Sequence, residues 1–181
     1  MKYLVMGNSG SGKSTFAREL QQVTQANLLP LDFLWHQTNY SEEAQAWFRS
    51  EQEKFIRTNE HWIIDGNYLG TSDLRFNHAD TLILLKVPRL LSLFRVISRS
   101  FKRRINPASR PDMPRTFQEK FDREYLDFLI YIWQFPNKQV VELEKILQEQ
   151  SNKIQVVILK SKKDKKIFLQ ELTEKKRRKE S

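Results

Sequence analysis

The sequence contains no cysteine, few histidines and no long apolar run. Without cysteine the chain has no disulfide bonds and no thiolate metal site. The three histidines, His36, His61 and His78, are too scattered to predict a metal cluster. No apolar run approaches the roughly 20 residues that span a bilayer. The first strand pattern begins at residue 2, so we expect no signal peptide, no membrane partner and a cytoplasmic protein.

Glycine is also scarce, and the five glycines lie at positions 7, 10, 12, 66 and 70. Glycine is the residue that adopts left-handed backbone conformations at little cost and lets a ligand approach the backbone closely. The chain therefore concentrates its backbone freedom at two sites, around residues 7–12 and 66–70. Both sites are candidates for function.

Positive charge is unevenly distributed along the 181 residues, which carry a net charge of +9. Residues 86–115 contain nine basic residues and one acid, and residues 160–181 contain ten basic residues and four acids. The rest of the chain is therefore mildly acidic. Two local basic segments predict local anion binding rather than a uniformly basic surface. A chain of this length is most often one domain with a substantial core.

The first glycine site matches the phosphate-binding loop pattern, in which a glycine is followed after four residues by Gly-Lys-Ser. An apolar strand pattern over residues 2–6 precedes the loop, and a helical pattern over residues 13–23 follows it, as the motif requires. We predict that the whole loop binds nucleotide: Gly7, Asn8, Ser9, Gly10, Ser11, Gly12, Lys13, Ser14 and Thr15.

Each position in this loop has a physical reason. Backbone N–H groups can converge on a triphosphate where glycines leave the approach open, and the helix beginning near Lys13 adds its positive dipole end. Lys13 would reach the β- and γ-phosphates as a catalytic residue, the Ser14 hydroxyl would bind Mg²⁺, and Thr15 would lie near the α-phosphate. The alternative is a flexible Gly/Ser turn with a solvated lysine, which requires strand, glycines, Lys-Ser and helix to coincide by accident.

The second glycine site follows the short apolar strand pattern at residues 62–64. Asp65 ends this strand, and Gly66 lets the chain turn away. A carboxylate at the end of a strand beside the phosphate loop is typical of enzymes that hold Mg²⁺ through water, so Asp65 is a predicted catalytic and metal residue. We place Gly66 and Asn67 on the substrate side. The alternative is a purely structural Asp-Gly turn.

Further candidates for the substrate side are Asp32 and Arg75. Asp32 follows the apolar pattern of residues 28–31, and ligands of open α/β sheets bind at the carboxyl ends of strands. It could orient a phosphoryl acceptor or hold a metal-bound water, or it could simply be a cap or loop carboxylate. Arg75 would reach an acceptor anion or be solvated. The nearby aromatic residues would stack on a flat acceptor or belong to the core: Trp35, His36 and Tyr40.

A second arginine-rich region follows the buried strand pattern at residues 81–87. The helical pattern at residues 89–102 has an apolar face formed by Leu90, Leu93, Phe94 and Ile97, and it carries Arg95 and Arg99 four residues apart. Two aligned guanidinium groups suit a transferring phosphoryl group, so both are predicted catalytic residues, with a solvated basic face as the alternative. Residues 103–115 contain three of the chain's six prolines and also four arginines. We predict a lid over residues 100–116, with Arg110 and Arg115 facing anions.

The rest of the chain alternates helices and strands. Helical patterns cover residues 117–135, 138–150 and the region around 168–172, and a fifth strand pattern covers residues 154–159. This alternation predicts an α/β fold with a parallel sheet, helices on both faces and right-handed crossovers. We expect one domain over residues 1–174 and a solvated, frayed basic tail over residues 175–181. The turn at residues 161–164 would border the nucleotide base.

The chain resembles the family of topology modulation proteins, which are related to adenylate kinases. The resemblance covers most of the chain, and the string from Trp62 to Tyr68 narrows it to this family. It implies a five-stranded parallel sheet of order 2-3-1-4-5, ATP as donor, Mg²⁺, and Arg95 and Arg99 flanking a short lid. Asn67 and Tyr68 replace the aromatic, proline and arginine with which adenylate kinases engage AMP, so the resemblance leaves the acceptor open.

Three functions are compatible with these patterns. The favoured one is a kinase that transfers the γ-phosphate of ATP to a small-molecule or nucleotide acceptor. The second is an ATP-binding regulator associated with DNA, suggested by the basic segments and by the family's name, which binds without phosphotransfer. The third is a slow ATPase; an Asn-Lys-x-Asp guanine signature is absent from the sequence, which disfavours GTP.

Overall fold

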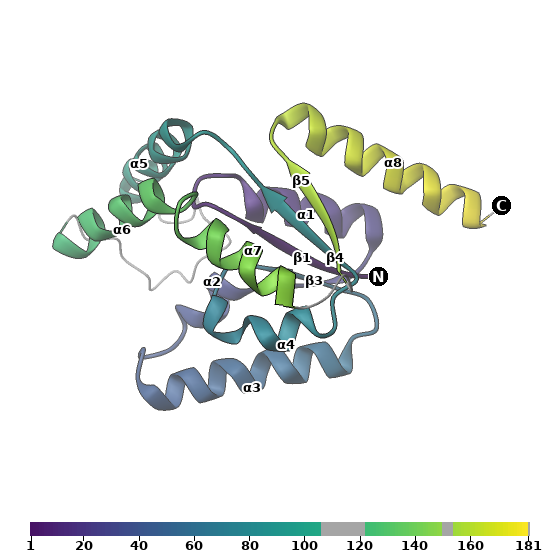
Figure 1. The fold of residues 1–181 in the computed structure, drawn as a ribbon, viewed down its shortest axis with the longest axis horizontal. Coiled ribbons are helices and arrows are strands. Elements are labelled where there is room, and N and C mark those ends of the chain that lie inside the picture. Colours follow the sequence, from purple (N-terminus) through teal and green to yellow (C-terminus); the bar gives the residue numbers. More distant parts are fainter. Residues whose placement is uncertain (106–121, 150–153, 181) are drawn as a thin grey trace.

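A five-stranded parallel sheet forms the centre of the computed structural model, which describes residues 1–105, 122–149 and 154–180. The strand order is β2-β3-β1-β4-β5, and every neighbouring pair is parallel. The prediction of the sheet and of its order is confirmed (Figure 1). The strands are β1 Lys2–Gly7, β2 Asn27–Pro30, β3 Trp62–Asp65, β4 Thr81–Leu85 and β5 Gln155–Leu159.

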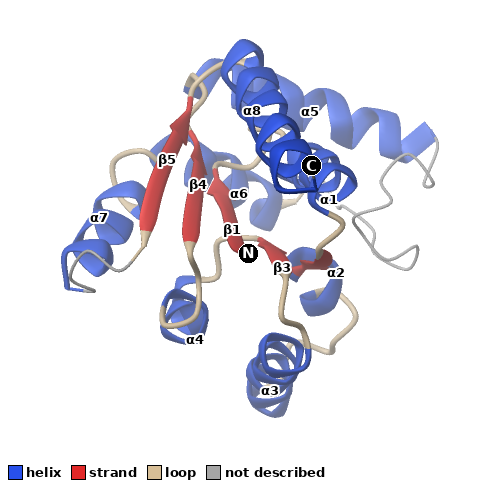
Figure 2. Cartoon of the chain, turned by 90° about the vertical axis from the view of Figure 1, so that its right-hand side faces the viewer, coloured by secondary structure: helices blue, strands red, loops and turns tan. Residues whose placement is uncertain are grey.

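Helices cover both faces of the sheet and complete a three-layer α/β fold (Figure 2). The long helices α1 and α8 lie on one face, and α3, α4 and α7 lie on the other. The described helices are α1 Lys13–Thr24, α2 Leu31–Trp35, α3 Glu42–Thr58, the 3₁₀ turn η1 Leu69–Thr71, α4 Ser72–Phe76, α5 Arg89–Ile105, α6 Arg123–Gln134, α7 Gln139–Glu149 and α8 Lys162–Glu180. In the part of the chain that the structure describes, none of them is long and apolar enough to cross a membrane.

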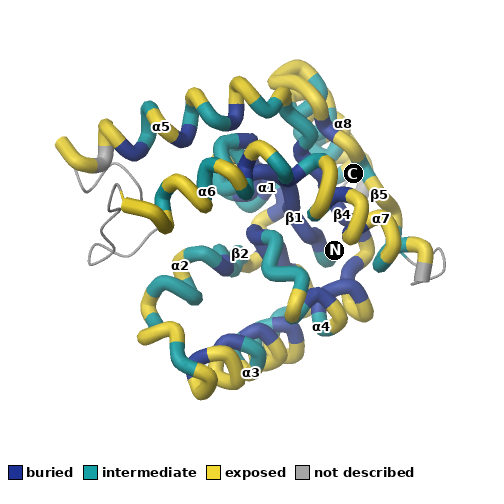
Figure 3. Tube along the Cα trace, turned by 60° about the vertical axis from the view of Figure 1, so that its left-hand side comes forward, coloured by how far each residue is buried: buried dark blue, intermediate teal, exposed yellow. Residues whose placement is uncertain are grey.

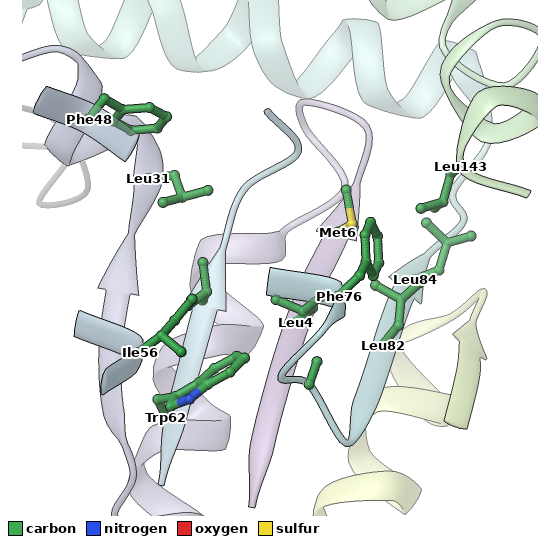
Figure 4. Close-up of a cluster of buried hydrophobic side chains, with 12 residues drawn as sticks. Leu4, Met6, Leu31, Phe48, Ile56, Trp62, Phe76, Leu82, Leu84 and Leu143 are labelled. Carbon is green, nitrogen blue, oxygen red and sulfur yellow. The ribbon is translucent and has the colours of Figure 1, made fainter. Parts of the chain in front are cut away.

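The central strands supply two hydrophobic clusters because successive side chains of a strand point to opposite faces. In β1, Leu4 and Met6 enter the cluster under α3, α4 and α7, whereas Tyr3 and Val5 enter the cluster under α1 and α8. Figure 4 shows the first cluster, with Trp62 among its largest members. Burial on both faces explains why these strands are continuous apolar runs in the sequence.

The described elements differ from the predicted ones mainly towards the C-terminus. Helix α5 runs to Ile105, so the first part of the predicted lid is helical; the rest, with Arg110 and Arg115, lies outside the described residues. Helix α8 continues to Glu180, so residues 175–180 are helical, and the fraying of the tail remains a prediction. Lysine, arginine and glutamate are good helix formers, and the acids at 171 and 174 lie four residues before basic residues.

The apolar face predicted for α5 does not face the core. Ser92, Val96 and Ser100 are at most 2% exposed, whereas Leu90 and Phe94 are 72% and 70% exposed. Periodicity identifies the apolar side of a helix, but the position of the helix at the rim of the sheet decides which side is covered.

Candidate active site

The phosphate loop lies where the sequence predicts it, between β1 and α1. Gly10 and Gly12 have φ angles of 78° and 83°, in the left-handed region that glycine tolerates. A Cβ on Gly10 would lie 2.4 Å from the carbonyl oxygen of Ser92, so α5 packs directly against the loop at this point. Glycine is therefore required at position 10 by the packing of the protein itself.

Lys13 begins α1 and remains close to the loop. Its Nζ lies 3.3 Å from the carbonyl oxygen of Asn8, and the residue is 9% exposed. Gly12 is the N-cap and provides no side-chain cap, and the first turn carries no acid. A helix N-terminus of this kind presents backbone N–H groups and a positive dipole to an anion. Ser14 is half-buried and Thr15 is exposed in the same turn.

Asp65 ends β3 directly beside the strand that leads into the phosphate loop. It pairs in register with Val5, and the next residue, Gly66, donates its N–H to the Val5 carbonyl at 3.1 Å. Asp65 is only 5% exposed. This placement fits the predicted metal role, because a carboxylate and the Ser14 hydroxyl are hard oxygen ligands of the kind that Mg²⁺ prefers. Among the described residues no three metal-ligating side chains form a cluster, so phosphates and water would complete the coordination.

Asn67 connects the turn after β3 to the phosphate loop. Its Oδ1 accepts from the Gly7 N–H at 3.1 Å, and its Nδ2 donates to the Gly7 carbonyl at 3.0 Å. The Tyr131 hydroxyl on α6 lies near the Asn67 side chain. The sequence suggests an acceptor contact for Asn67, which remains a prediction; the structure shows that its side chain holds the loop.

Arg75 is buried under the same turn, with 1% of its surface exposed. Its guanidinium donates to the carbonyls of Gly66 at 3.1 Å, of Asn67 at 2.8 Å and of Tyr68 at 2.6 Å. Burial lowers the pKa of Arg75 to about 10. The alternative of a solvated arginine is therefore wrong. With Nε 3.5 Å from the Thr71 carbonyl, four of its five N–H donors are directed at the backbone, so Arg75 shapes the acceptor side from beneath.

Asp32 lies in the first turn of α2, with its carboxylate near the Tyr68 hydroxyl. Burial raises the pKa of Tyr68, and the negative charge of Asp32 raises it further, so Tyr68 stays protonated. Burial also raises the pKa of Tyr131; the nearby Asn67 side chain opposes this shift, and the charge of Asp32 adds to it. One carboxylate and two tyrosines thus lie near one another beside the loop, and the role of Asp32 remains a prediction.

Of the aromatic residues after β2, Trp35 packs against the core, and stacking of His36 and Tyr40 on an acceptor remains a prediction. Trp35 packs edge-on against Phe48 at 5.2 Å between ring centroids and against Tyr68 at 6.4 Å, at the edge of a core cluster. Tyr40 is 50% exposed, and its hydroxyl lies 3.0 Å from Nδ1 of His36. Trp35 therefore supports Tyr68 from behind, whereas the His36–Tyr40 pair borders solvent.

Arg95 reaches the phosphate loop from α5. Its Nη1 donates to the Gly10 carbonyl at 3.2 Å, beside the contact of Ser92 with Gly10. Arg99 lies one turn further along α5 and is half-buried. The structure brings Arg95 and the loop together, and the role of Arg99 in catalysis remains a prediction.

Asn8 attaches helix α6 to the loop through a proline. The carbonyl of Ile132 would normally accept from the residue four positions later, but this residue is Pro136, which has no N–H. Asn8 Nδ2 donates to that carbonyl at 2.8 Å instead, and Asn8 is 3% exposed. The two helices on either side of the predicted lid, α5 and α6, are thus both bonded to the phosphate loop.

Lys165 is a site residue that the sequence patterns did not indicate. Its Nζ donates to the Ser11 carbonyl at 2.9 Å, from the first turn of α8. Burial lowers the pKa of Lys165, and the positive charges of Arg95 and Lys13 lower it further. Lys13, Arg95 and Lys165 therefore form a cluster around the loop, which we call the loop cations.

A signal for Lys165 was present in the sequence. Ser161 and Asp164 form a reciprocal capping box: the Asp164 N–H donates to Ser161 Oγ at 3.1 Å, and the Ser161 N–H donates to Asp164 Oδ2 at 3.0 Å. This motif fixes the start of α8 at Lys162 and places Lys165 in the first turn, at the carboxyl end of the sheet. Sequence spacing alone does not show that this end faces the phosphate loop.

The fold and the loop together define a phosphate-loop α/β protein. No protein-family model and no curated protein sequence matches the chain. Solved structures do match it, among them shikimate kinase from Acinetobacter baumannii, with a TM-score of 0.51 and 14% identity over 94% of this chain and 88% of that one.

Two further matches have similar statistics. Shikimate kinase from Bacteroides thetaiotaomicron has a TM-score of 0.50 and 17% identity over 96% of this chain and 97% of that one. Deoxyadenosine kinase from M. mycoides with bound dCTP has a TM-score of 0.50 and 16% identity over 96% of this chain and 100% of that one. At such low identity these likenesses show the fold that phosphate-loop kinases share.

Proposed function

We propose that this protein is a phosphotransferase that transfers the γ-phosphate of ATP to a small-molecule or nucleotide acceptor. The observation that carries the proposal is the position of Asp32. Its carboxylate lies near the Tyr68 hydroxyl, and Tyr68 directly follows Asn67, whose amide is bonded to Gly7 of the phosphate loop. A carboxylate suited to an acceptor hydroxyl therefore lies close to a loop suited to the donor.

The nucleotide-binding part of the proposal rests on the loop cations. The N-terminus of α1 and the loop N–H groups would bind the phosphates, and Lys13, Arg95 and Lys165 would neutralise them. Ser14, and Asp65 through water, would hold Mg²⁺, which supplies positive charge at the phosphate oxygens. The lowered pKa of Lys165 indicates that this region already carries concentrated positive charge, which an anion would relieve.

The transfer step in the proposal depends on positioning and electrostatics. Asp32 would orient the acceptor hydroxyl and accept its proton, with Tyr68 and Tyr131 fixing the carboxylate environment. Arg95 and Arg99, one turn apart on α5, would stabilise the charge on the transferring group. We further propose a relationship to topology modulation proteins and adenylate kinases, which the Trp62–Tyr68 string supports.

The test is ADP release from MgATP, alone and with nucleoside monophosphates, nucleosides, shikimate and gluconate as acceptors. We expect one acceptor to stimulate release, Lys13→Ala to abolish it, and Asp32→Asn to abolish the stimulation while ATP still binds. Lys166→Ala is the matched control, because Lys166 is an exposed lysine on α8. Acceptor-independent release alone would support a slow ATPase, and full turnover by Lys13→Ala would contradict the proposed role of the loop.

A DNA-associated regulator is the second candidate. The structure favours it at one place, the end of α8, where Lys175, Lys176, Arg177 and Arg178 occur on a continuous helix. This function predicts duplex binding that weakens steeply with salt and that is lost when the four residues become glutamine. A flat acceptor panel together with such binding would favour the regulator over the kinase.

A further inference from the structure

Helix α5 buries its small residues and exposes its large ones. The covered side carries Ser92, Val96 and Ser100. The opposite side carries a stripe of large apolar residues with exposures between 37% and 88%: Leu90, Phe94, Ile97, Phe101 and Ile105. When the outer side of a surface helix carries a continuous apolar stripe, the stripe is typical of a surface that a partner covers.

Helix α6 extends the same surface. It packs beside α5, as Figures 1 and 3 show. Its exposed large apolar residues are Leu126 at 60%, Ile130 at 52% and Trp133 at 46%. More than half of the exposed large apolar side chains in the described residues lie on these two helices. We call the residues of both stripes, with Leu91, the α5–α6 apolar face.

The spacing of this face identifies helices as its partner. Leu90, Phe94, Ile97 and Phe101 are separated by four, three and four residues, and the residues of α6 are separated by four and three. Alternating steps of three and four make the a/d seam with which helices pack by knobs into holes. Two adjacent helices with such seams, meeting the same surface on another chain, would form a four-helix bundle.

Exposed charges near the two stripes are opposite in sign. On α5, Arg95 is directed at the phosphate loop and Arg89 contacts the α6 side of its own chain, whereas Lys102 and Arg104 are exposed. Exposed acids, Glu124 and Asp127, lie on α6. In a two-fold arrangement in which α5 of one chain faces α6 of the other, these opposite charges would lie near each other on both sides.

We propose that the α5–α6 apolar face is the interface of a two-fold dimer of this chain. Taking about 200 Å² for a large apolar side chain, its nine residues expose on the order of 1,000 Å², which exceeds the roughly 800 Å² that one partner contributes to a standard interface. The inference is independent of the proposed kinase activity. Because α5 and α6 are both bonded to the phosphate loop, a dimer would cover the outer sides of both helices and so support the loop.

The first test measures mass in solution by light scattering after gel filtration and by sedimentation at micromolar concentration. We expect twice the 21.7 kDa of one chain. The double variant Phe94→Ser/Phe101→Ser should weaken the dimer at least about 100-fold, because large aromatic residues dominate interfaces. Its circular dichroism and melting temperature should stay near those of the unchanged protein, because Phe94 is 70% and Phe101 56% exposed in one chain. Trp47→Ser, at 41% exposure on α3, is the matched control and should remain dimeric.

A second test uses the absence of cysteine. Single cysteines at positions 94, 97 and 101, introduced one at a time, should yield a disulfide-linked dimer for the position nearest the two-fold axis. A cysteine at position 47 should not. A monomer at all concentrations, an oligomer that the double variant leaves intact, or no cross-link at any of the three positions would overturn the proposal. A monomer that floats with anionic phosphatidylserine vesicles through this face would overturn it in favour of a membrane surface.

Discussion

Replacing Lys165 tests how the loop cations work. Lys165→Met removes the charge and retains most of the side-chain volume. Its Nζ lies 2.9 Å from the Ser11 carbonyl, so a phosphate held by the adjoining N–H groups would be about 5 Å away. Coulomb's law with an effective dielectric constant near 20 gives roughly 3 kcal/mol for unit charges at this distance, and solvent screening at a half-buried site reduces it to about 1–2 kcal/mol.

The expected result for Lys165→Met is therefore a roughly 5- to 30-fold weaker binding of MgATP. Isothermal titration calorimetry measures this change, and Lys165→Arg should restore most of the affinity. Lys166→Met, which alters an exposed neighbour on the same helix, is the control and should change affinity by less than about twofold.

The pH dependence of binding provides a sharper readout. Burial and neighbouring cations lower the pKa of Lys165, and a bound anion would raise it again. Affinity should therefore be complete while Lys165 is protonated and should fall as pH rises through its lowered pKa, earlier than for an ordinary lysine. Lys165→Met should lack this alkaline decline. Unchanged affinity in Lys165→Met at every pH would refute the assignment of Lys165 to the phosphates.

Three further predictions concern the supports of the site. Arg75→Ala leaves four backbone carbonyls without this donor and should lower the free energy of unfolding by about 3 kcal/mol, which corresponds to a melting temperature roughly 10 °C lower by calorimetry; Arg75→Lys should recover only part of this loss. A melting temperature equal to that of the unchanged protein would contradict the role of Arg75 in holding the turn after β3. Asn67→Ala removes both bonds to Gly7 and should weaken MgATP binding by about tenfold with an unaltered far-ultraviolet spectrum, whereas an acceptor-only role would change the acceptor KM and leave nucleotide affinity intact. Asp164→Ala removes the capping box and should lower the free energy of unfolding, measured in urea, by about 1 kcal/mol. An unchanged free energy of unfolding would contradict the start of α8 at this capping box.

The sequence by itself determined the elements that depend on local pattern. A phosphate loop between a strand and a helix, and an aspartate followed by glycine at a strand end, are short-range features whose physical requirements are met within a few residues. The buried strands were readable because both of their faces are covered, which makes them continuous apolar runs. The strand order followed from the resemblance that these motifs carry.

Only the tertiary structure decided what the long polar side chains contact. Lys165 and Ser11 are 154 positions apart, and Asn8 and Ile132 are 124 apart, so no local spacing links them. By its sequence context Arg75 could bind an acceptor anion or be solvated; the structure instead directs its guanidinium N–H groups to backbone carbonyls of the turn after β3. The same holds for the apolar face of α5: periodicity shows which side of a helix is apolar, and packing at the rim of the sheet determines which side is covered.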